Sequence, residues 1–166
     1  MNRTLFRRSR LGRRALVAGA VLMAALVPMT TAEAAAPSNS DLEVVRIDPD
    51  DTAPGGTTTV HGFTTNLGPE QTASPFTVVV TLPEGVTAVE PFYPENCTRS
   101  ENGHQVRCTF PAGLVVFRSA TAQIPVEVAP TVPIGTLEGG SVTVTSPDDR
   151  NGANNREPYT IKVVEG

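Results

Sequence analysis

The residues best placed for covalent chemistry are the two cysteines, Cys97 and Cys108, which bracket the segment CTRSENGHQVRC. Asn102-Gly103 lies at its midpoint and predicts a type I′ hairpin turn, because that turn needs positive φ at both central positions. Counting outward pairs Cys97 with Cys108 at a hydrogen-bonded position, where Cα atoms about 5.5 Å apart allow a disulfide. A longer loop or a bulge would shift this register. We expect a structural disulfide rather than a redox or zinc site, because the spacing is not CxxC and the chain has no other thiol.

An oxygen-rich segment, S-P-D-D-R-N-G-A-N-N at positions 146–155, is the candidate metal site. Carboxylate and carboxamide oxygens bind calcium, and the candidate ligands are Asp148, Asp149, Asn151 and Asn154. The spacing does not fit an EF-hand, because Gly152 is fourth when Asp149 is counted first, and the glycine belongs at the sixth position. The preferred interpretation is a loop held by Asx turns before the last strand, with no cofactor.

A second candidate is the aromatic pair Phe92 and Tyr93, which lies in a proline-rich loop between Glu90 and Glu95. Loops on a rigid scaffold often carry binding residues, so this pair is the candidate interaction surface. The alternative, which we prefer, is that the rings cap one end of the hydrophobic core.

Sequence motifs of catalysis are absent from the chain: it has no G-x-S-x-G, no HExxH and no phosphate-binding loop. His61 and His104 have no carboxylate or cysteine at ligand spacing, so we interpret both as ordinary surface residues. The chain is therefore predicted not to be an enzyme. An enzyme is the remote alternative, because distant residues can assemble a triad in any fold.

Short apolar runs, rich in valine and threonine and interrupted by proline and glycine, must position these candidates. Their alternation suits β-strands, and no window shows the spacing of an amphipathic helix. The predicted strands are 42–47, 57–65, 76–82, 86–89, a hairpin over 97–110, 121–128, 141–145 and 159–164. About seven or eight short strands without intervening helices predict an all-β sandwich or barrel. Pro125 predicts an edge or a bulge for its strand, because proline cannot donate to a ladder.

The first 34 residues have the pattern of a cleavable signal peptide. Six arginines lie within the first 14 residues, and an apolar run follows over residues 15–27. This run is shorter than the roughly 20 apolar residues that a membrane-spanning helix needs. Small residues favour cleavage after Ala34, with Ala36 as the second choice. Residues 35–40 then form a flexible lead-in, and 41–166 form one domain.

Two export routes fit this leader. Arg13-Arg14-Ala15-Leu16-Val17 is a partial match to a twin-arginine signal, and that route exports folded proteins. A disulfide would then have to form in the reducing cytosol, so we favour general secretion. The mature chain is therefore expected to be secreted or extracellular, and it is expected to be monomeric.

The charge of the mature chain limits its partners. Of 13 basic and 17 acidic residues, six arginines and Glu33 lie in the leader, which leaves 7 basic and 16 acidic residues, a net charge of −9. Such a domain repels phosphate backbones, so no nucleic-acid partner is expected. Anionic membrane surfaces are disfavoured too, so no membrane partner is expected after cleavage.

Several short motifs resemble one protein family. They are Pro54–Thr58, Asn66–Pro69, the strand Thr77–Gly85 that ends in Leu-Pro-x-Gly, the cysteine pair, and Asn154-Asn155. Their order over residues 41–164 resembles the conserved-repeat, Ig-like domain of bacterial surface proteins. This is the domain-of-unknown-function family numbered eleven, and it is close to the CARDB-like adhesion modules. This chain has one copy where the family has tandem copies, and 114–128 lacks the usual glycine-based lead-in. The resemblance implies an Ig-like antiparallel β-sandwich, an extracellular setting and no catalytic residues.

These observations predict a secreted, non-catalytic Ig-like protein of the bacterial cell envelope or medium. Its role would be structural, adhesive or protein-binding, toward an unidentified protein or cell-wall partner. The alternative is a secreted ligand-binding or inhibitory protein of similar architecture.

Overall fold

Alternating apolar and polar residues give most strands one buried and one exposed face. In Thr57–Asn66, for example, every second residue from Thr58 to Asn66 is buried. The computed structural model describes residues 37–166. The predicted signal peptide at 1–34, and cleavage after Ala34 or Ala36, lie outside the described residues.

The described part contains nine strands and one short 3-10 turn. They are β1 (Leu42–Val44), β2 (Thr57–Asn66), β3 (Phe76–Thr81), β4 (Val86–Ala88), β5 (Cys97–Arg99), β6 (Gln105–Phe110), β7 (Ser119–Val128), β8 (Gly135–Thr145), η1 (Gly152–Asn154) and β9 (Arg156–Val163). Within residues 37–166, no helix has the length and apolar character needed to cross a membrane.

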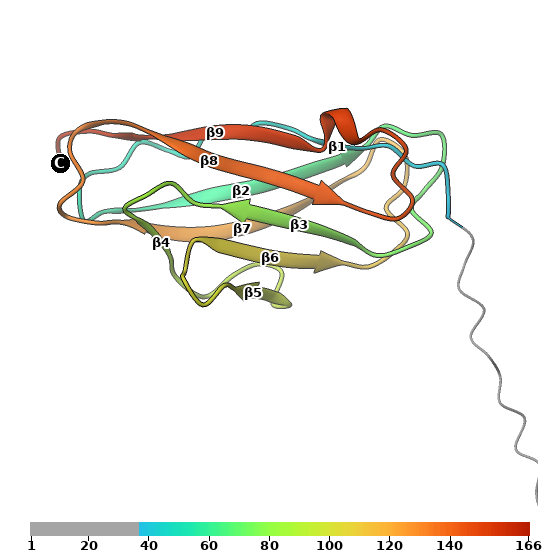
Figure 1. Ribbon diagram of the computed structural model, residues 1–166, viewed down its shortest axis with the longest axis horizontal. Coiled ribbons are helices and arrows are strands. Elements are labelled where there is room, and N and C mark those ends of the chain that lie inside the picture. Colours follow the sequence, from blue (N-terminus) through green and yellow to red (C-terminus); the bar gives the residue numbers. More distant parts are fainter. Residues whose placement is uncertain (1–36) are drawn as a thin grey trace, which may run out of the picture. The chain divides into compact units, whose positions relative to one another are not determined.

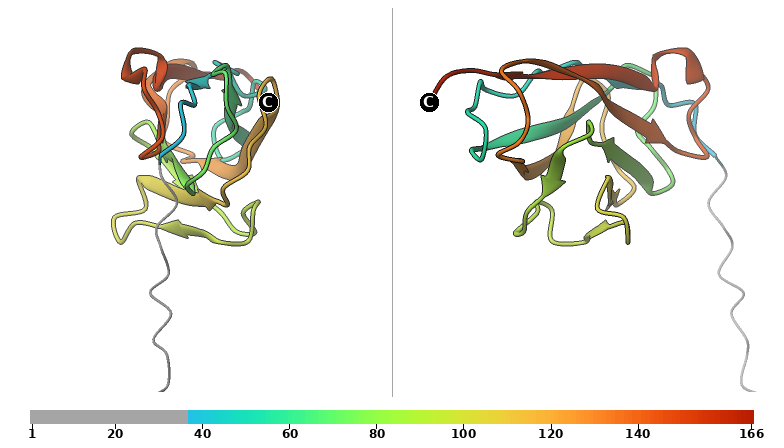
Figure 2. Two further views of the ribbon diagram at one scale, coloured as in Figure 1. Left: turned by 90° about the vertical axis from the view of Figure 1, so that its right-hand side faces the viewer. Right: turned by 60° about the vertical axis from the view of Figure 1, so that its left-hand side comes forward.

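Two antiparallel sheets face each other (Figure 1, Figure 2). One has the strand order β1-β2-β7-β4, and the other has the order β5-β6-β3-β8-β9. The core between them is mostly valine, leucine and isoleucine, with Phe76, Phe110 and Tyr159 among its aromatic residues. This arrangement confirms the predicted all-β, Ig-like antiparallel sandwich.

Several predicted strand boundaries were wrong, including the start of β9, which is Arg156 rather than Tyr159. The first strand ends at Val44 rather than Ile47, because the following segment runs beside β9. There the N–H of Thr52 donates to the Lys162 carbonyl at 3.1 Å. β8 begins at Gly135 rather than Ser141, with an irregular pairing to β9 between Leu137 and Gly140 that interrupts the alternation read from the sequence.

The prediction from Pro125 was wrong about its strand. β7 pairs with β2 on one side and with β4 on the other, so it is an interior strand with a continuous register against β2. The Pro125 carbonyl accepts the N–H of Val89 at 2.8 Å, which places its nitrogen on the β4 side. Proline has no N–H to donate to a neighbouring strand. Pro125 bonds to Val89, which lies one residue beyond the end of β4 at Ala88, so the missing N–H falls outside that short strand.

The cysteine hairpin has the predicted register but a different turn. Cys97 pairs with Cys108, while only Gly103 in the turn has positive φ, so the predicted type I′ turn was wrong. The N–H of Ser100 donates to Gln105 at 2.8 Å, which makes the loop four residues long. This change places the cysteines at a non-hydrogen-bonded position, where strands lie closer, and their Cα atoms are 4.0 Å apart rather than about 5.5 Å.

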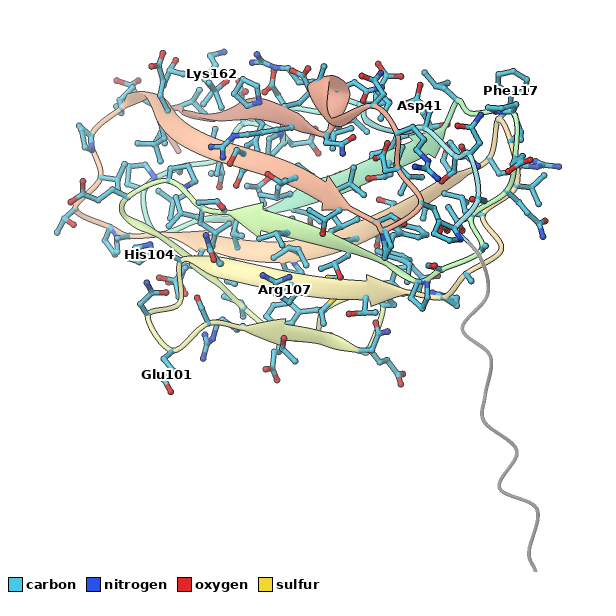
Figure 3. The ribbon with its side chains drawn as sticks, turned by 45° about the vertical axis from the view of Figure 1, so that its right-hand side comes forward. Asp41, Glu101, His104, Arg107, Phe117 and Lys162 are labelled. Carbon is cyan, nitrogen blue, oxygen red and sulfur yellow. A yellow bond between two sulfur atoms is a disulfide. The ribbon has the colours of Figure 1, made fainter. Side chains whose placement is uncertain are left out.

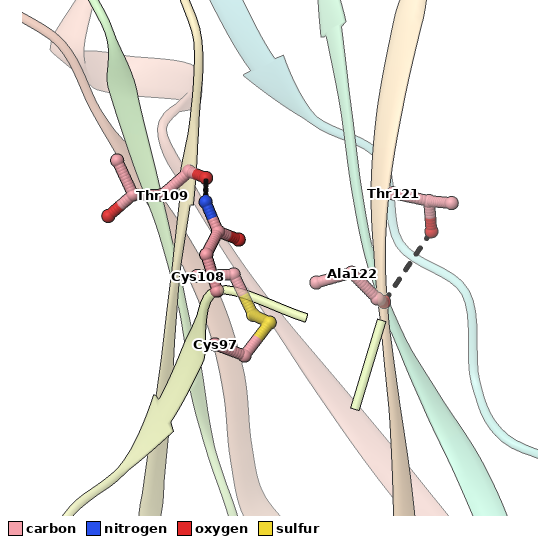
Figure 4. Close-up of a disulfide and its surroundings, with 6 residues drawn as sticks. Cys97, Cys108, Thr109, Thr121 and Ala122 are labelled. Carbon is pink, nitrogen blue, oxygen red and sulfur yellow. Dashed lines mark hydrogen bonds between the residues drawn. A yellow bond between two sulfur atoms is a disulfide. The ribbon is translucent and has the colours of Figure 1, made fainter. Parts of the chain in front are cut away.

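The Cys97–Cys108 disulfide is present, as predicted, and it points into the core. Cys108 is fully buried, and the bond lies opposite Thr121 and Ala122 of β7 (Figure 4). The bond therefore ties the edge strand β5 to β6 and contributes apolar surface to the core.

Replacing both Cys97 and Cys108 by alanine is expected to lower the free energy of unfolding by about 2–3 kcal/mol, because the bond closes a short loop. Urea unfolding measures the loss. Reduction of the unaltered chain should produce a similar loss, and an unchanged midpoint after reduction would contradict the expectation.

The lead-in predicted to be flexible is bonded to the sandwich from Ser38 onward. The N–H of Ser38 donates to Asp148 at 3.3 Å, and Ser40 is fully buried and forms a parallel bridge with Asp149. Gly68 permits this passage, because a Cβ there would lie 2.7 Å from the Cα of Ser40. The domain's contacts therefore begin before Asp41.

Candidate interaction site

The loop at 146–155, the candidate calcium site, forms hydrogen bonds within the protein. Asp148 is fully buried, and its carboxylate accepts the N–H of Ser74 at 2.6 Å and the Ser74 hydroxyl at 3.0 Å. A third bond comes from the N–H of Ser38. Asp148 thus joins the β8–β9 loop to the β2–β3 loop and the lead-in, three segments far apart in the sequence.

The other candidate calcium ligands contact separate partners. Asp149 accepts the N–H of Asn151 at 3.0 Å, an Asx turn of the kind that the preferred interpretation predicted. The Asn154 carboxamide donates to Asp41 at 3.0 Å. Among residues 37–166, no group of three or more His, Cys, Asp or Glu side chains could hold a metal ion.

Hydrogen bonding determines the pKa of two aspartates. Burial by itself would raise the pKa of Asp148, but the bonds from Ser74 and Ser38 outweigh it and hold that pKa below its ordinary value. Burial likewise opposes a lowered pKa at Asp48. There the N–H of Thr160 and the Arg46 guanidinium outweigh burial and lower the pKa.

Of the two aromatic residues, Phe92 packs at the end of the core and Tyr93 is exposed. Phe92 is buried at the margin of the core, as the preferred interpretation predicted. Tyr93 is 58% exposed, and its backbone forms a two-way bridge with Gln123 of β7, at 3.1 Å and 2.8 Å. Tyr93 therefore continues the ladder of β7 beyond the end of β4.

Sequence reasoning missed the best-connected polar side chain of the described residues, Asn66. It is fully buried at the end of β2, and its carboxamide nitrogen donates to the carbonyls of Glu70 at 2.8 Å and Leu114 at 2.9 Å. Its carboxamide oxygen accepts the N–H groups of Asp41 and Gly68. Asn66 thus joins the start of the domain at Asp41, the β2–β3 loop and the β6–β7 loop at one end of the sandwich.

Asn66 also fixes an unusual residue of the β6–β7 loop, Phe117. The N–H of Phe117 donates to the Asn66 carbonyl at 2.8 Å, and the N–H of Asn66 donates to the Arg118 carbonyl. Phe117 has φ of +59°, the only positive φ among the non-glycine residues 37–166. Its side chain is 78% exposed, and Figure 3 shows it at the same end of the sandwich as Asp41.

Two further exposed apolar residues come from the loops at this end of the sandwich, Leu67 and Val115. We call Leu67, Val115 and Phe117 the apolar end surface. The same β6–β7 loop lines a cavity of about 200 Å³, the end cavity, whose walls include Phe76, Phe110, Leu114 and Ala120. The rings of Phe76 and Phe110 stack with centroids 5.1 Å apart. The feature of the sequence that could have indicated this surface is the apolar run 114–117, which lies in a loop rather than in a strand.

Replacing Phe117 by asparagine is expected to raise the free energy of unfolding by about 1 kcal/mol. Asparagine tolerates the left-handed backbone that a bulky side chain disfavours, and the exposed ring loses little packing. Urea unfolding checks this. A decrease in stability would show that the ring supports the fold instead of projecting from it.

No family model matches this chain, and no curated protein matches its sequence. Solved structures show a likeness of fold. One is the third cohesin ScaC of Acetivibrio cellulolyticus, solved in complex with the ScaB dockerin. The two structures align with a TM-score of 0.52 and 14% sequence identity, and the alignment covers 76% of this chain and 99% of the cohesin.

Two others have lower TM-scores. AvmM, which catalyses macrocyclization in alchivemycin A biosynthesis, has a TM-score of 0.38 and 12% identity over 78% of this chain and 90% of that chain. PapD-like domain 7 of human CEP192 has a TM-score of 0.35 and 14% identity over 87% of this chain and 96% of that chain. At such identities the cohesin likeness shows the β-sandwich fold alone.

Proposed function

We propose that this chain is a secreted, non-catalytic protein-interaction module of the bacterial cell envelope or medium, and that it docks through the apolar end surface. One observation carries the proposal: Phe117 is largely exposed in a backbone conformation that costs about 1–2 kcal/mol. A fully buried asparagine supports that conformation. A strained, exposed and positioned aromatic residue is typical of a binding site.

Other observations support parts of this proposal. The cohesin of similar fold was solved bound to a dockerin, so a sandwich of this kind can support protein docking. The arginine-rich leader and the disulfide favour an oxidising compartment outside the cytosol. The resemblance to conserved-repeat Ig-like domains favours the cell surface.

Affinity capture from culture medium and envelope extract tests the docking role. The full-length chain is compared with Phe117→Ser and with the matched control Ile134→Ser. Ile134 is also an exposed apolar loop residue, 58% exposed, but it follows β7 whereas Phe117 precedes it, so the two lie at opposite ends of that strand.

We expect a captured protein to be retained by the unaltered chain and by Ile134→Ser, and to be lost with Phe117→Ser. The amount of captured protein should fall at least tenfold, because a binding residue that contributes more than about 1.4 kcal/mol changes the affinity by at least that factor. Equal retention by all three chains, or no retention by any, would contradict docking through the apolar end surface.

A further inference from the structure

Backbone groups of β7 alternate between its two neighbours. The N–H of Val128 donates to the Gly56 carbonyl, and the Val128 carbonyl accepts the N–H of Gly55, just before β2 begins, so even-numbered residues face β2. The bonds of Gln123 with Tyr93, and of Pro125 with Val89, show that odd-numbered residues face the opposite side. Ser119 and Thr121 therefore direct their N–H and carbonyl groups toward that second side.

No strand covers Ser119 and Thr121 on this side within the described part of the chain. β4 pairs only with the far end of β7, and Tyr93 is the last residue that continues its ladder. After Tyr93 the chain leaves toward β5, and residues 37–166 supply no bonding partner for the backbone groups of Ser119 and Thr121. The start of β7 is thus an open strand edge, which can pair with another chain.

Apolar residues lie next to the open edge. Ala120, between Ser119 and Thr121, lines the end cavity together with Phe110 and Leu114. Phe117 is exposed two residues before the edge begins. Side chains of a strand alternate between faces, so an added strand would direct every second side chain toward the core face of the sheet, where Ala120 lines this cavity.

We propose that the partner is captured by strand addition: an extended segment pairs with Ser119 and Thr121 and places an apolar side chain in the end cavity. This inference rests on the proposed function and specifies the kind of partner. Backbone pairing gives affinity, and the cavity selects a side chain such as valine or leucine. Residues 37–166 carry 16 acidic and 7 basic residues, so the segment is expected to have cationic flanks.

A proline at position 121 isolates the backbone contribution. Thr121→Pro removes an N–H that bonds to nothing within residues 37–166, and β7 already contains Pro125 facing the same side. Thr121→Val is the matched control, because it keeps the N–H. Ser119→Pro, at the first residue of β7, is a second variant if Thr121→Pro does not fold.

The probe is a fluorescent synthetic peptide of alternating valine and threonine with a lysine at each end. We expect it to bind the full-length chain and Thr121→Val, and to bind the proline variants at least tenfold more weakly. Amide exchange gives a second readout: Ser119 and Thr121 should exchange rapidly in the free chain and slowly with the peptide bound.

Three outcomes would overturn strand addition: no binding to the unaltered chain, equal binding to a folded proline variant, or no protection of Ser119 and Thr121 in the complex. None of them affects the Phe117-dependent capture that tests the proposed function. If capture depends on Phe117 while the proline variants bind normally, docking through side chains stands and strand addition fails.

Discussion

Replacing Asn66 by aspartate is expected to lower the free energy of unfolding by about 4 kcal/mol. The Asn66 carboxamide nitrogen donates to the carbonyls of Glu70 and Leu114, and a carboxylate at this position has no hydrogen to donate. It would instead place a charge, fully buried, against two carbonyl oxygens. Because these bonds join the end loops, the variant should also lose Phe117-dependent capture.

Urea unfolding of Asn66→Asp, compared with Asn39→Asp, measures this effect. Asn39 is exposed, so the control changes the same chemical group without burying a charge and should alter the stability by less than about 0.5 kcal/mol. Equal stability of the two variants would show that the Asn66 bonds do not hold the end loops together.

Replacing Asp148 by alanine is expected to lower the free energy of unfolding by about 3 kcal/mol. Its carboxylate is fully buried and accepts the N–H and the hydroxyl of Ser74 and the N–H of Ser38. Alanine removes all three bonds and leaves these donors without a partner, which costs more than the bonds themselves contributed. Urea unfolding checks this, with Asp50→Ala as control, since Asp50 is an exposed aspartate.

The same aspartate makes stability depend on pH. The folded-state pKa of Asp148 is lowered by its hydrogen bonds, so its contribution is present above the ordinary aspartate pKa and is lost as the pH falls through the lowered value. Asp48, whose pKa is lowered by Thr160 and Arg46, acts in the same direction.

Unfolding measured from about pH 7 down to about pH 2 should show the unaltered chain losing stability below about pH 4. Asp148→Ala should lose less over this range, because the bonds that protonation breaks are already gone. The same decrease in both proteins would show that Asp148 does not contribute to the acid sensitivity.

The fold follows from local patterns in this sequence. Buried and less buried residues alternate along β2 and β3, and in β7 every second residue from Ala122 to Val128 is fully buried. Symmetric cysteines around Asn102-Gly103 give the hairpin register and the disulfide. Such patterns depend on residues close in sequence, which a single chain displays directly.

The candidate site depends on contacts between distant segments, which local patterns do not contain. In the sequence Asn66 belongs to the short motif Asn66–Pro69, and only the folded chain brings Leu114 and Asp41 to its side chain. The run 114–117 has the composition of a strand, but its bonds to Asn66 and a turn between Val115 and Arg118 make it a loop. The Asx interpretation of the 146–155 loop succeeded because that turn closes between Asp149 and Asn151, which are neighbours in sequence.

Photo-crosslinking in the producing cells tests docking through the apolar end surface most directly. A photoreactive phenylalanine analogue is placed at position 117 of the full-length chain, or at position 134 as the control at the opposite end of β7. We predict an adduct with one partner protein from position 117 and none from position 134. An adduct from position 134 together with none from position 117 would contradict the proposed docking surface.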